Sequence, residues 1–358
     1  MPTDKRAQEL AKIAVEYSIN VKPKEKVIIS GGAESIPFLK ELYKQIIKKE
    51  AYPIVKVGLP DIADFFYKNA KDHQIEFFPD YWFNTVKDAD CFIGVYTESN
   101  TRELTNVPGE KISRRQKVTE PISTYIVDGK PDIRRLTMAY PCRAHAQEAS
   151  MSLQEWENYV YDSCLIEWRE FAKTLTKRNK KFEEGKEVEL KGEGVDLKFS
   201  IKGQNSVADK GEENMPGGEI FMAPDKKTLE GEIKFDYPRI YSGQKISGVW
   251  LKFEKGEIVD FDAEEGKDIL KEIIKTDKNS KYIGEFGIGC NPDITQYTNN
   301  LLFDEKIDGT IHLAIGKAYK ENGGGNDSAV HVDIVKDMSN CKLILDGETV
   351  QENKEWKI

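Results

Sequence analysis

Cysteine is scarce in this sequence, and its spacing carries no recognisable chemistry. The chain of 358 residues has five cysteines, which stand far apart at Cys91, Cys142, Cys164, Cys290 and Cys341. An odd number without a CxxC or CxH spacing argues against a disulfide framework and against a thiolate zinc site. We therefore expect free thiols and a reducing, cytoplasmic environment.

Long apolar runs and an excess of positive charge are also missing. No uninterrupted apolar stretch reaches the roughly 18 residues that a membrane helix needs, and the initial MPTDKRAQEL lacks the apolar segment of a secretory signal. The net charge is -9, whereas binding to nucleic-acid phosphates requires a basic surface. We expect no membrane span, no Sec-type secretion and no nucleic-acid partner.

Histidine is equally scarce, yet two of the four histidines fall in one short stretch, Gly284 to Val335. His312 and His331 are accompanied there by three oxygen donors, Glu285, Tyr319 and Asp333. Nitrogen and oxygen donors of these types hold divalent metals such as zinc or cobalt. The alternative is that the histidines only pack and form hydrogen bonds. Of the other two, His73 has the sequence context of a surface residue, and His145 is not assigned a role.

Two segments of this stretch alternate in the manner of β-strands. In 310–316 the apolar residues alternate with His312, and in 328–335 they alternate with His331 and Asp333, so these last two share the less apolar face. The glycine-rich run between the segments predicts a turn. A hairpin centred on it would place His312 opposite Val335 and make Asp333 its diagonal neighbour, about 7 to 8 Å away. His331 would lie further along and would need a shifted register or a second metal.

The glycine run, KENGGGND at residues 320–327, has another possible reading. Consecutive glycines also form nests that bind phosphate. Because no Walker A pattern accompanies the run, a flexible loop is the favoured interpretation.

The N-terminal half alternates apolar strands with amphipathic helices. Strands are predicted at 26–30, 52–59 and 89–96, and helices at 3–17, 35–48 and 61–70. This alternation is typical of a parallel sheet with covering helices. The glycines after the first predicted strand stand in GGAESIP, which is not GxGxxG, so dinucleotide binding is not expected.

A long helix is predicted from Ser152 to Phe182, because apolar residues recur there every three or four positions. Its charged tail predicts a domain boundary, giving an N-terminal α/β domain at 1–182 and a C-terminal domain at 183–358. Period-two segments at 188–190, 195–201 and 248–253 predict an α+β, largely antiparallel β fold for the second domain. The charged run Asp304, Glu305 and Lys306 is expected to cap or decorate a turn.

Four blocks of the C-terminal half resemble the thermophilic metallo-aminopeptidase family (aminopeptidase T and S type). They are NMPGGEIFMAP at 214–224, GEFGIGCNPDIT at 284–295, NLLFDEKIDGTIHLAIGKAY at 300–319 and GGGNDSAVHVD at 323–333. The N-terminal half resembles the family in layout and in the segment at 139–152. Four blocks in the same order make a more specific match than any short motif.

The resemblance implies a set of metal ligands. Carried over residue by residue, they are Glu219, Glu285, His312, Tyr319, His331 and Asp333. Glu219 and Glu285 become the candidates for general base, and Tyr319 for a ligand or an oxyanion donor. Some family members have an acidic residue before the first glutamate where this chain has Gly218, so no second carboxylate is assigned there. The loop between His312 and His331 is short compared with that of some relatives.

The resemblance further implies an activity: two divalent ions (zinc, cobalt or manganese) would activate water to release N-terminal amino acids from short peptides. It also implies a homodimer. Three alternatives remain open at this point. They are a dinuclear metal hydrolase acting on another class of substrate, a catalytically silent metal-binding homologue, and a non-enzymatic protein whose histidines merely pack.

Overall fold

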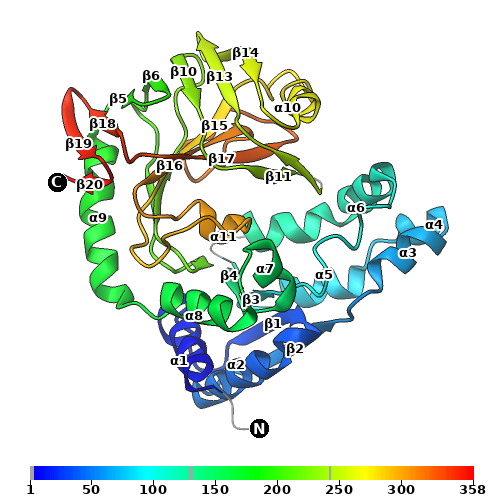
Figure 1. Cartoon of the computed structure of the whole chain (residues 1–358). Helices are drawn as coiled ribbons and strands as arrows, with labels where there is room; N and C mark the ends of the chain where they lie inside the picture. The colour runs from blue at the N-terminus through cyan, green and yellow to red at the C-terminus, as the bar shows by residue number, and fades with distance from the viewer. Residues whose placement is uncertain (1–3, 129–131, 242) are drawn as a thin grey trace. The chain divides into compact units, whose positions relative to one another are not determined.

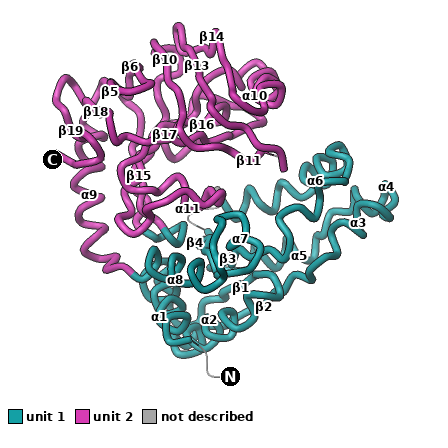
Figure 2. The backbone as a smooth tube through the Cα atoms, viewed as in Figure 1, with its two compact units in different colours: residues 1–165, 211–216 teal, residues 166–210, 217–358 magenta. Residues whose placement is uncertain are grey.

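The computed structural model describes residues 4–128, 132–241 and 243–358, which separate into two compact units (Figure 2). Unit 1 comprises the chain up to residue 165 together with 211–216, and unit 2 comprises 166–210 and 217–358. The boundary predicted after residue 182 lies inside a helix of unit 2. The return of 211–216 to unit 1 had no counterpart in the sequence pattern.

Unit 1 is built on a five-stranded parallel sheet, as the alternating pattern predicts (Figure 1). Its strand order is β2-β1-β3-β4-β8. The strands are β1 (Lys26–Gly32), β2 (Tyr52–Gly58), β3 (Cys91–Tyr96), β4 (Arg134–Ala139) and β8 (Asn214–Met215). The last strand comes from the segment that returns from unit 2, so the sheet is completed by residues remote in sequence.

Helices accompany this sheet, and α2 shows how such a helix buries one side. In α2, Phe38, Leu39, Leu42 and Ile46 recur every three or four residues and are buried. The described helices of unit 1 are α1 (Lys5–Ile13, continued by a π-helical turn at Ala14–Ser18), α2 (Ile36–Lys48, preceded by a 3-10 turn at Ala33–Ser35), α3 (Ala63–Asn69), α4 (Asp72–Ile75), α5 (Asp80–Lys87), α6 (Gly109–Asp128), α7 (Arg143–Glu148) and α8 (Leu153–Cys164).

The single long helix predicted from 152 to 182 is wrong, because the structure has two helices there. Helix α8 ends at Cys164 and α9 (Trp168–Glu184) begins after a break at 165–167. Neither glycine nor proline marks the break. It coincides with the passage of the chain from unit 1 to unit 2 after residue 165, so tertiary organisation rather than local sequence ends the helix.

Unit 2 contains two antiparallel sheets and a short hairpin. The larger sheet runs β14-β13-β10-β6-β5-β18-β19-β20, and the smaller runs β17-β16-β15-β9-β7. The elements are β5 (Glu187–Gly192), β6 (Val195–Ser200), β7 (Val207–Asp209), β9 (Glu219–Met222), β10 (Glu230–Lys234), β11 (Arg239–Tyr241), β12 (Gln244–Ile246), β13 (Trp250–Glu254), β14 (Glu257–Asp262), α10 (Lys267–Ile274), β15 (Ile283–Gly289), α11 (Leu301–Asp304), β16 (Thr310–Gly316), β17 (His331–Asp337), β18 (Cys341–Leu345), β19 (Glu348–Glu352) and β20 (Glu355–Trp356). The prediction of a largely antiparallel second domain is confirmed.

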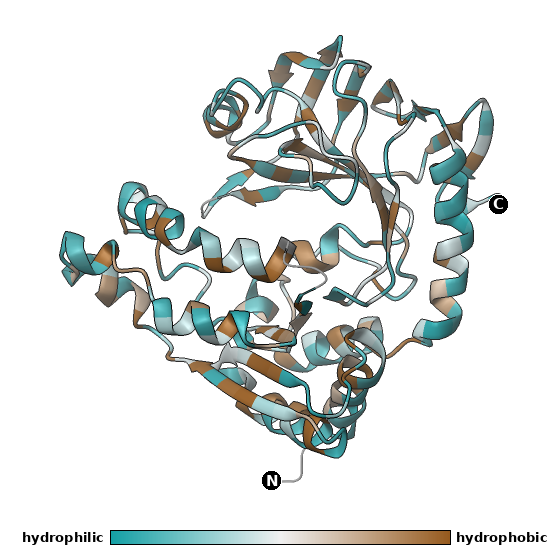
Figure 3. Ribbon diagram, turned by 180° about the vertical axis from the view of Figure 1, so that it is seen from behind, coloured by the Kyte–Doolittle hydropathy of each residue, from teal (hydrophilic) through white to brown (hydrophobic). Residues whose placement is uncertain are grey.

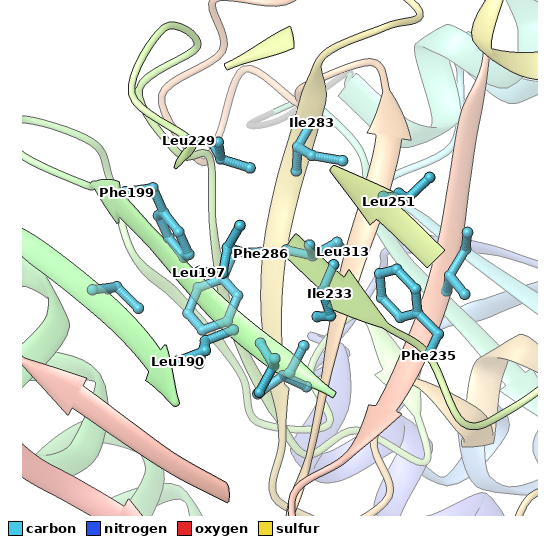
Figure 4. Packing of buried hydrophobic residues seen from close by; sticks show 14 of the residues in the cluster. Leu190, Leu197, Phe199, Leu229, Ile233, Phe235, Leu251, Ile283, Phe286 and Leu313 are labelled. Carbon is cyan, nitrogen blue, oxygen red and sulfur yellow. The ribbon is translucent and has the colours of Figure 1, made fainter. Parts of the chain in front are cut away.

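The core of unit 2 joins its two sheets. Phe286 and Leu313 from the smaller sheet belong to the same buried cluster as Leu197 and Phe199 from the larger one (Figure 4). The rings of Phe199 and Phe286 meet edge to face, with centroids 5.0 Å apart. Each such buried side chain contributes about 1.5 to 3 kcal/mol by leaving water. This packing commits one face of the smaller sheet to the core and leaves the other face for polar residues.

Figure 3 colours each residue by its hydropathy. Hydrophobic residues occur on both strands and helices, whereas α9 is largely hydrophilic. Among the helices of the described residues, none combines the length and apolar character needed to cross a bilayer.

Candidate metal centre

The register predicted for the hairpin β16–β17 is confirmed. His312 pairs with Val335, Ala314 with Asp333, and Gly316 with His331. Residues opposite one another, and residues two apart on a strand, share a face. His312, His331 and Asp333 therefore project from one side, while Leu313 and Ile334 point into the core. The shifted register considered for His331 does not occur.

The two neighbouring strands add carboxylates to this same face. Glu285 of β15 is opposite Ala314, and Glu219 of β9 is opposite Gly289. A bulge between Ile283 and Glu285 sends Ile283 into the core and leaves Glu285 on the polar face. Four adjacent strands thus deliver five predicted ligands to one side of a single sheet.

The side chains of this face form a row with His312 near its middle. The imidazole Nε2 of His312 lies 3.5 Å from Glu219 Oε2 and 3.5 Å from Glu285 Oε1. Ligand atoms of Glu285, His312 and Asp333 all lie within 4.8 Å of one another. At the far end, His331 Nε2 lies 3.5 Å from Asp333 Oδ1. Such spacing allows one ion to be shared by several of these groups.

Tyr319 joins the row at its His331 end. Its ring centroid is 4.7 Å from that of His331, and the two rings are tilted by 51°. Exposure differs along the row. His312 is 0% and Asp333 2% exposed, whereas the His331 side chain is 18% exposed and Tyr319 is half-buried. Among these residues, solvent therefore reaches the row chiefly where His331 and Tyr319 lie.

Two hydrogen bonds orient the ligands. His331 Nδ1 donates to the Lys317 carbonyl at 2.8 Å, because a carbonyl oxygen can only accept. This assigns the free electron pair of a neutral His331 to Nε2, the atom that faces Asp333, an arrangement typical of metal-bound histidines. Asn322 donates to Glu285 Oε2 at 3.1 Å and so holds the carboxylate whose Oε1 faces His312.

Other buried nitrogen and oxygen atoms of the proposed metal ligands have no hydrogen-bond partner among the described residues. Within 4–128, 132–241 and 243–358 these include Glu219 Oε2, both ring nitrogens of His312 and Asp333 Oδ1. Buried polar atoms are normally satisfied, so unpaired ones that converge on one point indicate that something else binds there. Carboxylate and imidazole donors at this spacing fit a divalent metal ion.

The charges of the row also support binding of a divalent metal ion. Burial opposes protonation of both histidines, but the carboxylates of Glu285 and Glu219 raise the pKa of His312 to about 9, and Asp333 raises that of His331 to about 10. Burial raises the pKa of Glu285 and of Glu219, Lys306 opposing the shift of the latter. Burial also disfavours ionised Asp333, yet its neighbour His331 lowers its pKa. The carboxylates thus favour positive charge in this row, and a metal ion that displaces the imidazole protons would supply it.

Two glycines shape this face. A Cβ on Gly287 would lie 2.0 Å from His312 Nε2, so the imidazole occupies the space that any other residue would fill. A Cβ on Gly218, which has φ +115°, would lie 2.7 Å from the Cβ of Asn291. Gly218, where some family members have an acidic residue, therefore leaves no room here for a side chain unless the segment moves.

Lys306 belongs to this site, and the expectation that it caps or decorates a turn is wrong. It is 0% exposed, and its ammonium lies 3.2 Å from Glu219 Oε1 and contacts Glu305. Asp304, expected to cap or decorate a turn, is also buried and accepts hydrogen bonds from Thr298. Asp209, opposite Glu219 on the edge strand β7, was likewise missed. Charged residues near a short helix look like surface in a sequence, and only tertiary pairing reveals otherwise.

Comparison with known proteins gives a consistent family match. The model of the family described as thermophilic metalloprotease (M29) matches residues 3–354. Aminopeptidase AmpS of Bacillus subtilis is 28% identical over 97% of both chains. Aminopeptidase T of Thermus thermophilus is 23% identical over 91% of both.

A solved structure extends the match to the fold. Wild-type AmpT from Thermus thermophilus superposes with a TM-score of 0.85 at 22% identity and covers 99% of each chain. At this level of identity the likeness establishes the architecture of both units, which agrees with the fold described above.

Proposed function

Since the chain belongs to the thermophilic metalloprotease (M29) family, we propose that it is a metal-dependent aminopeptidase that releases N-terminal residues from short peptides. The observation that carries the proposal is the row of donors on one face of the β9–β15–β16–β17 sheet, with buried atoms of Glu219, His312 and Asp333 lacking hydrogen-bond partners among the described residues. Relatives named aminopeptidases support the substrate class.

The row is long enough to suggest two ions. Glu219, Glu285 and His312 gather at one end, and His331, Asp333 and Tyr319 at the other. Glu285 and Asp333 both approach His312, so these two carboxylates would hold metal beside it. We propose Glu219, Glu285, His312, Tyr319, His331 and Asp333 as the ligands, with zinc, cobalt or manganese as the ion.

When bound, divalent ions supply a water of lowered pKa and polarise a peptide carbonyl. The protein residues fulfil the remaining requirements. The exposed His331 end admits the substrate, while the buried sheet face keeps bulk water away from the carboxylates. Glu219 and Glu285 are the candidates for proton transfer, and Tyr319 is the candidate for donating to a developing oxyanion in the alternative that it does not bind metal.

The test is hydrolysis of leucine p-nitroanilide by the chelator-stripped protein after addition of zinc, cobalt or manganese, beside an N-acetylated substrate. We expect activity only with metal and only on the free amine. Metal-dependent cleavage of a phosphoester, or of the acetylated substrate equally well, would point to another class of hydrolase. Stoichiometric metal binding without turnover of any substrate would indicate a catalytically silent homologue.

We further propose that the protein is a cytoplasmic homodimer. All five cysteines are free and buried, which suits a reducing compartment. Strand β2 forms an edge of the parallel sheet; its Val55 and Val57 are 48% and 40% exposed, and Leu59, directly after the strand, is 74% exposed. An apolar sheet edge of this kind is usually covered by a partner. Light scattering of the purified protein gives its mass, and a monomer at micromolar concentration would refute the dimer.

A further inference from the structure

Lys306 is buried as completely as any residue in the core, although it carries a charge. Its exposure is 0%, and its ammonium has two carboxylate partners, Glu219 at 3.2 Å and Glu305. A lysine in this position costs desolvation energy unless its charge is compensated. The two carboxylates provide that compensation, and the negative charge of Asp209 adds to it.

The backbone around Lys306 is tied to the strand that carries Glu219. Asn291 links the two segments. Its backbone N–H donates to the Lys306 carbonyl at 3.0 Å, and its side-chain Nδ2 donates to the Gly217 carbonyl at 2.9 Å. The Cys290 N–H donates to the Gly218 carbonyl at 2.8 Å. The lysine and the glutamate are thus held in a fixed relation by the same short segment.

The two oxygens of Glu219 have different environments. Oε1 faces the Lys306 ammonium, while Oε2 faces His312 Nε2 at 3.5 Å and has no hydrogen-bond partner in the described part of the chain. One oxygen of the carboxylate therefore faces the Lys306 ammonium, and the other faces the proposed metal ligands.

We infer that Lys306 is a positioning residue for the metal centre: it holds Oε1 of Glu219 away from the ions, so that Glu219 binds metal through Oε2 alone. This inference rests on the proposed function, because it presumes that the row binds metal. Without the lysine, Glu219 would be free to rotate or to turn toward other partners, and the ion at its end of the row would lose a fixed ligand.

A purely structural ion pair is the competing explanation, and the chain contains a matched example. Lys336 is also buried, and its ammonium lies 3.2 Å from Asp236 Oδ2. It pairs with Ile311, so it projects to the face of the sheet opposite His312. Lys336→Met removes a buried lysine from an ion pair of the same length without touching a proposed ligand.

The experiment is equilibrium dialysis of the chelator-stripped full chain against Co²⁺, with bound metal measured by elemental analysis and by the visible spectrum of the cobalt. We expect the wild type to bind two ions. Lys306→Met should bind one of them about 10- to 100-fold more weakly, the usual effect of removing a group that orients a ligand. Lys336→Met should bind both as the wild type does, and Lys306→Arg should recover part of the affinity.

A double-mutant cycle separates positioning from a general loss of structure. If Lys306 acts through Glu219, adding Lys306→Met to Glu219→Gln should weaken Co²⁺ binding no further. This pair removes both charges, so it also provides the comparison if Lys306→Met alone does not fold. Additive losses, or a Lys306→Met protein that binds both ions as tightly as the wild type, would overturn the inference. A wild type that binds no ion would overturn the proposed function as well.

Discussion

His145 in unit 1 and His312 in unit 2 are both buried, and both ring nitrogens of each lack a hydrogen-bond partner among the described residues. Their surroundings differ. The ring of His145 lies against that of Tyr96, with centroids 4.8 Å apart and a tilt of 31°, and a carboxylate oxygen of Glu98 is 3.9 Å from its Nε2. His312 has carboxylate oxygens of Glu219 and Glu285 at 3.5 Å.

The electrostatic result is opposite in the two places. Burial lowers the pKa of His145 to about 4, so that histidine is a neutral packing residue. At His312 the carboxylates outweigh burial and raise the pKa to about 9. A buried histidine therefore indicates a metal centre only when carboxylates converge on it, which is why histidine position alone was an ambiguous signal in the sequence.

The largest expected difference between these histidines is catalytic. His312→Ala removes a proposed ligand and should lower kcat/KM on leucine p-nitroanilide by more than about 100-fold, beyond the loss usual for a group that merely orients a ligand. His145→Gln should retain both metal and activity within about threefold, an effect below 1 kcal/mol. Both are measured as metal content and initial rates. Equal losses in the two variants would remove the distinction.

A smaller but still large effect is expected from crowding His312 without replacing it. Gly287→Ala places a methyl group where the ring now lies and should weaken Co²⁺ binding about 10- to 100-fold by displacing the ligand. The matched control is Gly109→Ala, since no atom lies within 4 Å of a Cβ built there. Dialysis against Co²⁺ measures both. Unchanged affinity in Gly287→Ala would show that the imidazole can move without consequence.

The two histidines should also give opposite pH slopes in the metal-free protein. His312 has a folded pKa of about 9 against an ordinary value of 6.5, so its stabilisation is present below pH 6.5 and is lost as the pH rises through 9. His145 has a folded pKa of about 4, so the unfolded chain takes up its proton first and acid destabilises the fold between pH 6.5 and 4.

At each histidine the difference between the folded and the ordinary pKa corresponds to roughly 3 kcal/mol of unfolding free energy. Denaturant unfolding of the metal-free protein from pH 4.5 to 9.5 measures it. His312→Gln should flatten the alkaline side and His145→Gln the acidic side. Flattening of the same side by both variants would contradict the assignment.

The smallest effect is expected at the carboxylate next to His145. Glu98 is 37% exposed in its side chain, and its oxygen is 3.9 Å from His145, so the pair is screened by water. Glu98→Gln should change the free energy of unfolding by less than about 1 kcal/mol and leave metal content unaltered. Thermal denaturation and elemental analysis test this. A large loss would mean that His145 depends on charge after all.

Local patterns were sufficient for the hairpin that carries half of the proposed ligands. The alternation around His312 and His331, with a glycine-rich loop between, predicted both the less apolar face that these side chains share and the pairing of His312 with Val335. Hairpin register depends on residues close in sequence, so it can be read directly from them. Glu219 and Glu285 carry no such local signal, and their place in the ligand set came from the resemblance to the family.

The sequence by itself determined the two fold classes, the strands that bear the histidines and the family. Only the tertiary structure brought Lys306 to Glu219, ended a helix at Cys164 without a breaker residue, and returned 211–216 to the parallel sheet of unit 1. The physical reason is the distance along the sequence between the residues that interact. Periodicity reports how a segment presents its own faces, whereas the pairing of a buried charge or the choice of a sheet partner depends on groups remote in sequence, whose positions are set when the chain folds.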